Sequence, residues 1–202
     1  MFNYLTIDDI MDSRSYERRR EQFRAEIIAV KKLRRVAVGP IMTLLFENRS
    51  TILFQIQEMA RAEKMTTDAQ IEIELDTYNP LIPARNELSA TLFLELTSKD
   101  EMLEWLPKLV GIEESIEIEI ASPKESFRIP SITEAAHKMQ LTRPDVTASV
   151  HYIRFDLGAD AAAAMANSTV TLRSVHHRYS YETVLSPETV ASLCSDWLPA
   201  TR

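Results

Sequence analysis

The spacing of apolar residues is most regular between residues 36 and 84, a stretch that leaves few residues for loops. Residues 41–46 form an apolar run that starts directly after a Gly-Pro pair. A run of this length behind two breaker residues predicts a buried strand rather than a helix. Asn48 follows, and its side-chain oxygen suits the N-cap of a helix. The apolar face of that helix would consist of Ile52, Leu53, Ile56, Met59 and Ala60.

Residues 67–75 carry two patterns at once. Isoleucine and leucine alternate with glutamate, as in a half-buried strand. However, Thr67 and Gln70 have the spacing of a capping box, and the apolar positions 71, 75 and 78 keep helical spacing. We therefore interpret this segment as a helix. The prolines at 80 and 83 would end it, because the residue before a proline is pushed out of the α region.

In the rest of the chain, segments with helical spacing of apolar residues also occur together with segments that have the alternation of strands. Unbroken helical spacing without Gly or Pro predicts one long helix from about residue 13 to 35. Strand patterns occupy residues 87–96, 116–120, 127–129, 146–157, 170–176 and 179–185, and further helices are expected at 98–110, 159–167 and 186–197. Because the strands follow each other through tight turns rather than βαβ units, we predict an α+β fold with a helical N-terminal half packed on an antiparallel sheet. We expect a single domain over residues 1–202, with a loose subdivision near 130–145.

Composition narrows the class of protein. The chain has 202 residues, of which 45% are hydrophobic and 26% charged, as is ordinary for a globular protein. Cys194 is the single cysteine, which fits a reducing compartment. The first twelve residues contain acids where a signal peptide needs an apolar core, and no apolar run approaches the ~18 residues of a membrane span. We therefore expect a cytoplasmic protein that does not enter a membrane.

Two further counts bear on function. Only three glycines are present and none lie close together, which excludes a Walker loop and a dinucleotide fingerprint. Residues 14–35 carry nine Arg or Lys against three Glu, a charge of +6. Because the net charge of the whole chain is −7, the rest of the chain has a charge of −13. A basic helix can bind nucleic acid, but no zinc-finger or RNA-recognition motif accompanies it. We expect instead a solvated face or a contact to an acidic protein surface.

Candidate chemistry is sparse. On strand parity, His151 and His176 could point into one pocket with Tyr179 nearby, as in a metal or acid–base site. No HExxH, ExxH or cysteine-pair spacing supports a metal, so we predict no metal and no cofactor, and satisfied structural histidines are the simpler interpretation. The polar face of the second helix supplies the other candidate binding residues, namely Asn48, Arg49, Gln55, Glu58 and Arg61.

Several longer strings resemble one bacterial family. VGP…LLFENR…QIQEMARAE, YNPLIP, SVHYIRFDL and HHRYSYETVLS are similar to a family known as domain of unknown function three-five-zero-one, over nearly the whole chain. The resemblance implies no activity, but it implies frequent encoding beside rubrerythrin-like proteins and iron–sulfur oxidoreductases. The chain has Val175-His-His-Arg-Tyr179 where the family suggests Asp-His-Pro-Ala-Tyr, which weakens a catalytic role for this turn.

These observations favour a cofactor-free, homodimeric accessory or interaction protein associated with redox proteins. The homodimer is suggested by the length of the first helix, since long helices commonly form subunit contacts. The alternative is a metal- or small-molecule-binding enzyme or sensor with a pocket near His151 and His176.

Overall fold

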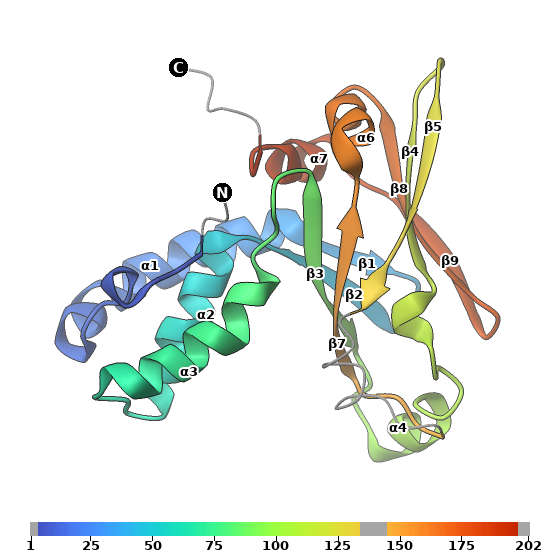
Figure 1. Cartoon of the computed structure of the whole chain (residues 1–202). Coiled ribbons are helices and arrows are strands. Elements are labelled where there is room, and N and C mark those ends of the chain that lie inside the picture. The colour runs from blue at the N-terminus through green and yellow to red at the C-terminus, as the bar shows by residue number, and fades with distance from the viewer. Residues whose placement is uncertain (1–3, 134–144, 198–202) are drawn as a thin grey trace.

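Two antiparallel sheets form the centre of the protein (Figure 1). The computed structural model describes residues 4–133 and 145–197. The five-stranded sheet has the order β1-β2-β3-β7-β6 and the four-stranded sheet the order β5-β4-β8-β9. The first consists of β1 (Arg35–Val38), β2 (Met42–Glu47), β3 (Glu87–Leu94), β7 (Val150–Asp156) and β6 (Ile132–Thr133), and the second of β5 (Ser126–Pro130), β4 (Ile116–Ala121), β8 (Thr169–His176) and β9 (Tyr179–Val184).

The first three α-helices form a layer beside the five-stranded sheet (Figure 1). They are α1 (Ser13–Arg34), α2 (Arg49–Ala62) and α3 (Asp68–Tyr78), preceded by the 3-10 turn η1 (Ile7–Asp9) and followed by η2 (Asn79–Leu81). Asn48 caps α2 by accepting hydrogen bonds from the backbone of Ser50 and Thr51. The five-stranded sheet is therefore covered on both faces, which explains why every residue of β2 is buried.

The remaining helices lie at the two ends of the sheets. In Figure 1, α6 (Gly158–Met165) and α7 (Pro187–Cys194) lie at the top, and α4 (Lys99–Trp105) lies at the bottom. The 3-10 turn η3 (Ile112–Glu114) leads from the bottom segment into β4. One apolar core fills the space between the sheets, and a second, smaller one lies under the helical layer and includes Ile52, Ile56 and Leu75.

The predicted α+β class is confirmed, and most predicted elements lie where expected. The segment is helical over Asp68–Tyr78 with Thr67 as its N-cap, so the capping box rather than the alternation indicated the correct structure. Three details differ. The strands divide into two sheets, β1 was not predicted, and α4 ends at Trp105 because Pro107 cannot continue a helix. Of the loose connection expected at 130–145, residues 130–133 finish β5 and form β6, while 134–144 lie outside the described residues.

Candidate functional site

The helix-facing side of the five-stranded sheet is unusually polar for a buried surface. Side chains alternate along a strand, so the residues of β2, β3 and β7 that do not enter the core between the sheets point toward the helices. Glu47 lies opposite Ser89, and Thr91 lies opposite Tyr152, in neighbouring strand pairs. Glu47, Ser89 and Thr91 are all buried. Buried polar groups need hydrogen-bond partners, so this surface has to be satisfied locally.

Glu47 is the centre of this polar surface. Its side chain is 7% exposed, and its two carboxylate oxygens accept hydrogen bonds from different threonines. The hydroxyl of Thr51, on α2, donates to Oε2 at 2.5 Å, and the hydroxyl of Thr91, on β3, donates to Oε1 at 2.7 Å. Both donors are neutral. In the part of the chain that the structure describes, no Lys or Arg forms an ion pair with Glu47.

A cavity of about 160 Å³ lies against this carboxylate. Gln55 of α2 and Lys31 of α1 contribute its polar lining from the helical side. Aromatic side chains contribute much of the remaining wall, namely Tyr78, Phe93 and Tyr152. Burial raises the pKa of the Tyr152 hydroxyl, and the neighbouring Tyr78 and Glu47 raise it further. The cavity thus combines a buried carboxylate with aromatic faces.

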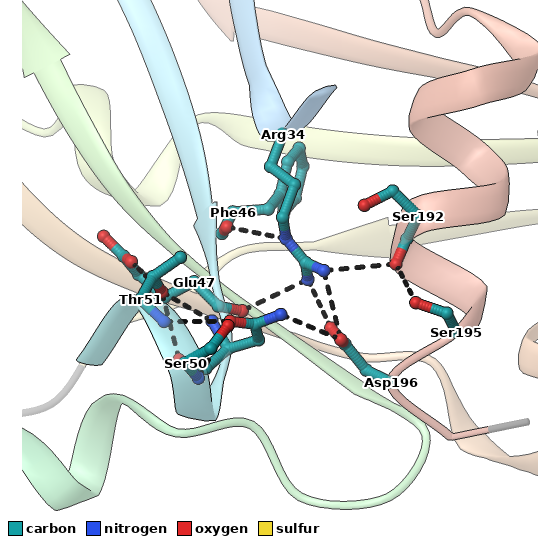
Figure 2. A network of polar contacts seen from close by, with 9 residues as sticks. Arg34, Phe46, Glu47, Ser50, Thr51, Ser192, Ser195 and Asp196 are labelled. Atoms are coloured by element: carbon teal, nitrogen blue, oxygen red, sulfur yellow. Dashed lines mark hydrogen bonds and ion pairs between the residues drawn. The ribbon is translucent and has the colours of Figure 1, made fainter. Parts of the chain in front are cut away.

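The backbone that carries Glu47 is held from behind by a buried arginine (Figure 2). Arg34 is 1% exposed and donates to the carbonyl oxygens of Phe46, at 3.0 Å, and of Glu47, at 3.4 Å. Its guanidinium also forms a bidentate ion pair with Asp196, just after α7. The Asn48 amide donates to the same carboxylate at 3.2 Å. The end of β2 and the start of α2 are therefore fixed by contacts to the last residue of α1 and to the segment after α7.

The other predicted residues of α2 bind neighbouring helices. Arg49 donates to Asp9 at 2.6 Å, and Arg61 donates to Glu17 at 2.5 Å. Glu58 accepts two hydrogen bonds from Arg20 at 2.8 Å and one from the hydroxyl of Tyr16 at 2.6 Å. These contacts hold the N-terminal segment and α1 against α2. A second cavity of about 480 Å³ lies at this junction, with mainly apolar walls that include Ile10, Met11, Ala60 and Ile71.

The two candidate histidines lie on the opposite side of the five-stranded sheet. His151 has the parity of Ile153 and Phe155, and His176 that of Leu172, so both face the layer between the sheets. Burial lowers the pKa of both imidazoles, and the carboxylate of Glu113 opposes this shift at each ring. The structure therefore brings both histidines near one buried carboxylate.

The hydrogen bonds of these histidines are local. Nε2 of His151 donates to the carbonyl of Ala148 at 2.9 Å, with Thr147 Oγ1 at the same distance. Nε2 of His176 donates to the carbonyl of Val110 at 3.2 Å, and its Nδ1 accepts from the backbone of Arg178. Because a carbonyl oxygen can only accept, Nε2 carries a proton in each ring and has a backbone partner.

Tyr179 connects the two sheets through its hydroxyl group. Its hydroxyl donates to the carbonyl of Val38 at 2.7 Å and accepts from the backbone of Ile41 and Met42 at 3.1 and 3.2 Å. Gly39 has φ +73°, and a Cβ there would lie 2.6 Å from this hydroxyl, so only glycine fits the turn. We infer that Tyr179 fastens β9 to the β1–β2 turn.

The predicted residues therefore divide into separate groups. Gln55 lines the cavity over Glu47, Arg61 lines the second cavity, and the histidines are separated from both by the five-stranded sheet. Sequence reasoning did not find Glu47 or Glu113. The signal for Glu47 was its place directly after the mainly apolar run at residues 41–46, where a charged residue that stays in the strand becomes buried. That the residues predicted from the sequence bind a ligand or partner stays a prediction.

Across residues 4–133 and 145–197, no group of three or more His, Cys, Asp or Glu side chains is placed to hold a metal ion. Over the same ranges, no helix has the length and apolar character needed to span a membrane.

The fold and the cavity define this chain as an α+β protein with two antiparallel sheets and a helical layer over a polar sheet face. It belongs to the family described as protein of unknown function (DUF3501), whose model matches residues 4–197. The chain is also similar to the crystal structure of a novel protein of unknown function from Burkholderia pseudomallei K96243. The two are 32% identical with a TM-score of 0.86, and the match covers 97% of this chain and 99% of the other. No curated protein matches this chain.

Proposed function

We propose that this protein is a cytoplasmic accessory protein that docks onto an acidic protein partner through the solvent side of α1. The observation that carries the proposal is a row of exposed side chains at helical spacing, which we name the α1 stripe. Ile28, at its centre, is 51% exposed. The α1 stripe consists of Arg14, Arg18, Glu21, Ala25, Ile28, Ala29 and Lys32, so its three cations outnumber its one carboxylate.

The charges of α1 distinguish the side that packs from the side that is open. Arg20 and Arg34, on the packed side, pair with Glu58 and Asp196. In contrast, no ion pair within the described residues involves Arg14, Arg18 or Lys32. Uncommitted cations around an exposed apolar side chain suit an acidic protein surface with an apolar centre.

The α1 stripe fits two other partners less well. Nucleic acid binds through rows of phosphate contacts, and the exposed Ile28, Ala25 and Ala29 offer none. A homodimer through this stripe would bring like charges together, which costs free energy. A homodimer of this chain would therefore use another surface, and light scattering from the purified protein measures that state directly.

The family resemblance suggests the class of partner to test. We propose a rubrerythrin-like protein encoded in the same genome. Calorimetry should show binding that weakens with salt, because exposed charges are screened. The Arg18→Glu/Lys32→Glu double variant should bind about tenfold more weakly, or ~1.4 kcal/mol. The control is Lys124→Glu, an exposed site on the β4–β5 turn. Equal affinity of the double variant and wild type would refute the docking face.

A second candidate function is a metal- or small-molecule-binding enzyme or sensor near His151 and His176. The observation that favours it is the buried carboxylate of Glu113, which opposes the lowering of the pKa of both imidazoles by burial, although these three side chains are not placed to hold one metal ion together. Elemental analysis of the purified protein tests the metal form of this hypothesis. Stoichiometric zinc or iron that is lost in His151→Gln would support it, whereas metal-free protein would leave both histidines as structural residues.

A further inference from the structure

We propose that the cavity over Glu47 binds a small zwitterion of the amino-acid class, with a primary ammonium group at one end and a carboxylate at the other. This inference goes beyond the docking function and does not depend on it. The α1 stripe lies on the solvent side of α1, whereas the cavity lies between the helices and the five-stranded sheet.

The first argument is the missing positive charge at Glu47. A carboxylate that is only 7% exposed needs hydrogen-bond donors or a cation as partners. Thr51 and Thr91 supply one neutral hydroxyl to each oxygen, which leaves each oxygen able to accept another hydrogen bond. A ligand ammonium group in the adjoining cavity would supply both the charge and the donors.

The second argument is the wall of the cavity. Tyr78, Phe93 and Tyr152 line it, and aromatic faces attract ammonium groups through their quadrupoles. The ring of Phe93 already holds the guanidinium of Arg35, 5.3 Å from its centre, so Tyr78 and Tyr152 carry this argument. Gln55 adds an amide, whose oxygen can accept a hydrogen bond from an ammonium group. Among the described residues, the side chain of Gln55 has no hydrogen-bond partner within the protein, so its amide oxygen can accept from a ligand. The acceptor set favours a primary ammonium over a quaternary one, because only the former can donate.

The third argument is Lys31, which lines the same cavity but is only half-buried. Its Nζ lies 5.6 Å from the ring centre of Phe54, and it forms no ion pair with Glu47. Lys31 would repel a ligand that is only a cation. A ligand carboxylate would instead pair with it, so the two protein charges together select a zwitterion. The volume of about 160 Å³ is below that of drug-sized pockets, so the ligand must be compact.

The test is calorimetric titration of the whole chain with glycine, β-alanine and 4-aminobutyrate, in which one, two and three methylene groups separate the two charges. Butylamine and butyrate are the single-charge controls. We expect one of the three amino acids to bind at least about tenfold more tightly than either control compound, because only it satisfies both protein charges.

Variants assign the two ends of the ligand. Glu47→Gln should weaken binding of the preferred amino acid by about tenfold or more. Lys31→Gln should weaken that binding too, but should strengthen binding of butylamine, since it removes the repulsion. Lys99→Gln, an exposed site on α4, is the matched control and should change neither. Gln55→Leu provides a second loss-of-binding variant if Glu47→Gln unfolds, which circular dichroism would reveal.

Three results would overturn the proposal. The first is that none of the amino acids binds the folded wild-type chain at millimolar concentration. The second is binding that survives both Glu47→Gln and Gln55→Leu. The third is butylamine or butyrate binding as tightly as the best amino acid, since the ligand would then not be a zwitterion.

Discussion

In the five-stranded sheet, strands β2, β3 and β7 contribute side chains to both faces, but one face is apolar and the other is polar. The face toward the second sheet, which we call the hydrocarbon face, is apolar apart from His151 and is formed by Met42, Leu44, Phe46, Leu88, Ala90, Leu92, Leu94, Ile153 and Phe155. The face toward the helices carries Thr43, Glu47, Ser89, Thr91 and Tyr152 among its residues. Both faces are covered, so exposure to water does not explain the difference.

This comparison suggests a division of labour. Buried hydrocarbon contributes about 25 cal/mol per Å², whereas buried polar groups contribute little net free energy even when satisfied. A fold that needed only stability would place apolar side chains on both faces. Retention of a carboxylate with threonine donors beside a cavity therefore points to binding on the helix-facing side. Substitutions on the two faces should accordingly affect different measurements.

The largest expected effect is on the hydrocarbon face. Phe46 is fully buried, and its ring centre lies 6.4 Å from that of Phe155. Phe46→Ala should lower the free energy of unfolding by about 3–5 kcal/mol, because it removes contacts and leaves a cavity. Urea denaturation measures this. Phe46→Leu is the control and should cost clearly less; a loss below about 1 kcal/mol in Phe46→Ala would contradict a tightly packed core at this position.

The buried arginine behind Glu47 should give the next largest effect. Asp196→Ala leaves Arg34 charged and buried, with only carbonyl partners, and should cost about 3 kcal/mol. Replacing both residues, as Arg34→Met/Asp196→Ala, removes the unpaired charge. The double variant should therefore be more stable than Asp196→Ala alone. If it is instead less stable, the carbonyl contacts of Arg34 outweigh the cost of its charge.

Smaller effects are expected on the polar face. Thr91→Val removes one donor to Glu47 and should cost about 1–2 kcal/mol, because a buried acceptor loses its partner. Glu47→Gln keeps the size of the side chain and removes its charge, so stability should change by less than about 1 kcal/mol. The same variant should nevertheless weaken ligand binding by about tenfold or more. A stability loss as large as that of Phe46→Ala would show that the polar face serves folding after all.

Sequence patterns predicted the elements better than they predicted these faces. The capping residues Asn48, Thr67 and Ser98 act locally, so the helices they open could be located directly. Which side of a strand meets which layer depends on contacts between distant segments, and the apolar run at 41–46 carried no information on that. The sequence pattern therefore did not identify Glu47 as a candidate site residue, although it directly follows this run in β2.

The candidate site was predicted only in part, for the same reason. Gln55 does line the cavity over Glu47. Other polar residues of the same helix, such as Arg49 and Glu58, bind Asp9 and Tyr16, which are about 40 residues away in the chain. A helical wheel shows that such residues share a face, but it does not show which segment will cover that face.

The smallest expected effect concerns Glu58, on the side of α2 away from the sheet, and it appears as a dependence on pH. Hydrogen bonds from Arg20 and, to a lesser extent, Tyr16 hold the pKa of Glu58 at about 2, against an ordinary value of 4.5. A carboxyl whose pKa is lowered by folding stabilises the protein above its unfolded pKa and loses that contribution as the pH falls. The loss should therefore occur between about pH 4.5 and 2.

The size of this contribution is limited by solvent. The Glu58 side chain is 26% exposed and that of Arg20 is 29% exposed, so we expect less than about 1 kcal/mol. Glu58→Gln should be less stable than wild type near neutral pH, and the difference should shrink as the pH is lowered. Glu72→Gln, at an exposed site on α3, should show no such convergence. A difference that is constant with pH would mean that Glu58 acts through packing, and the helical layer would then resemble the hydrocarbon face rather than the polar one.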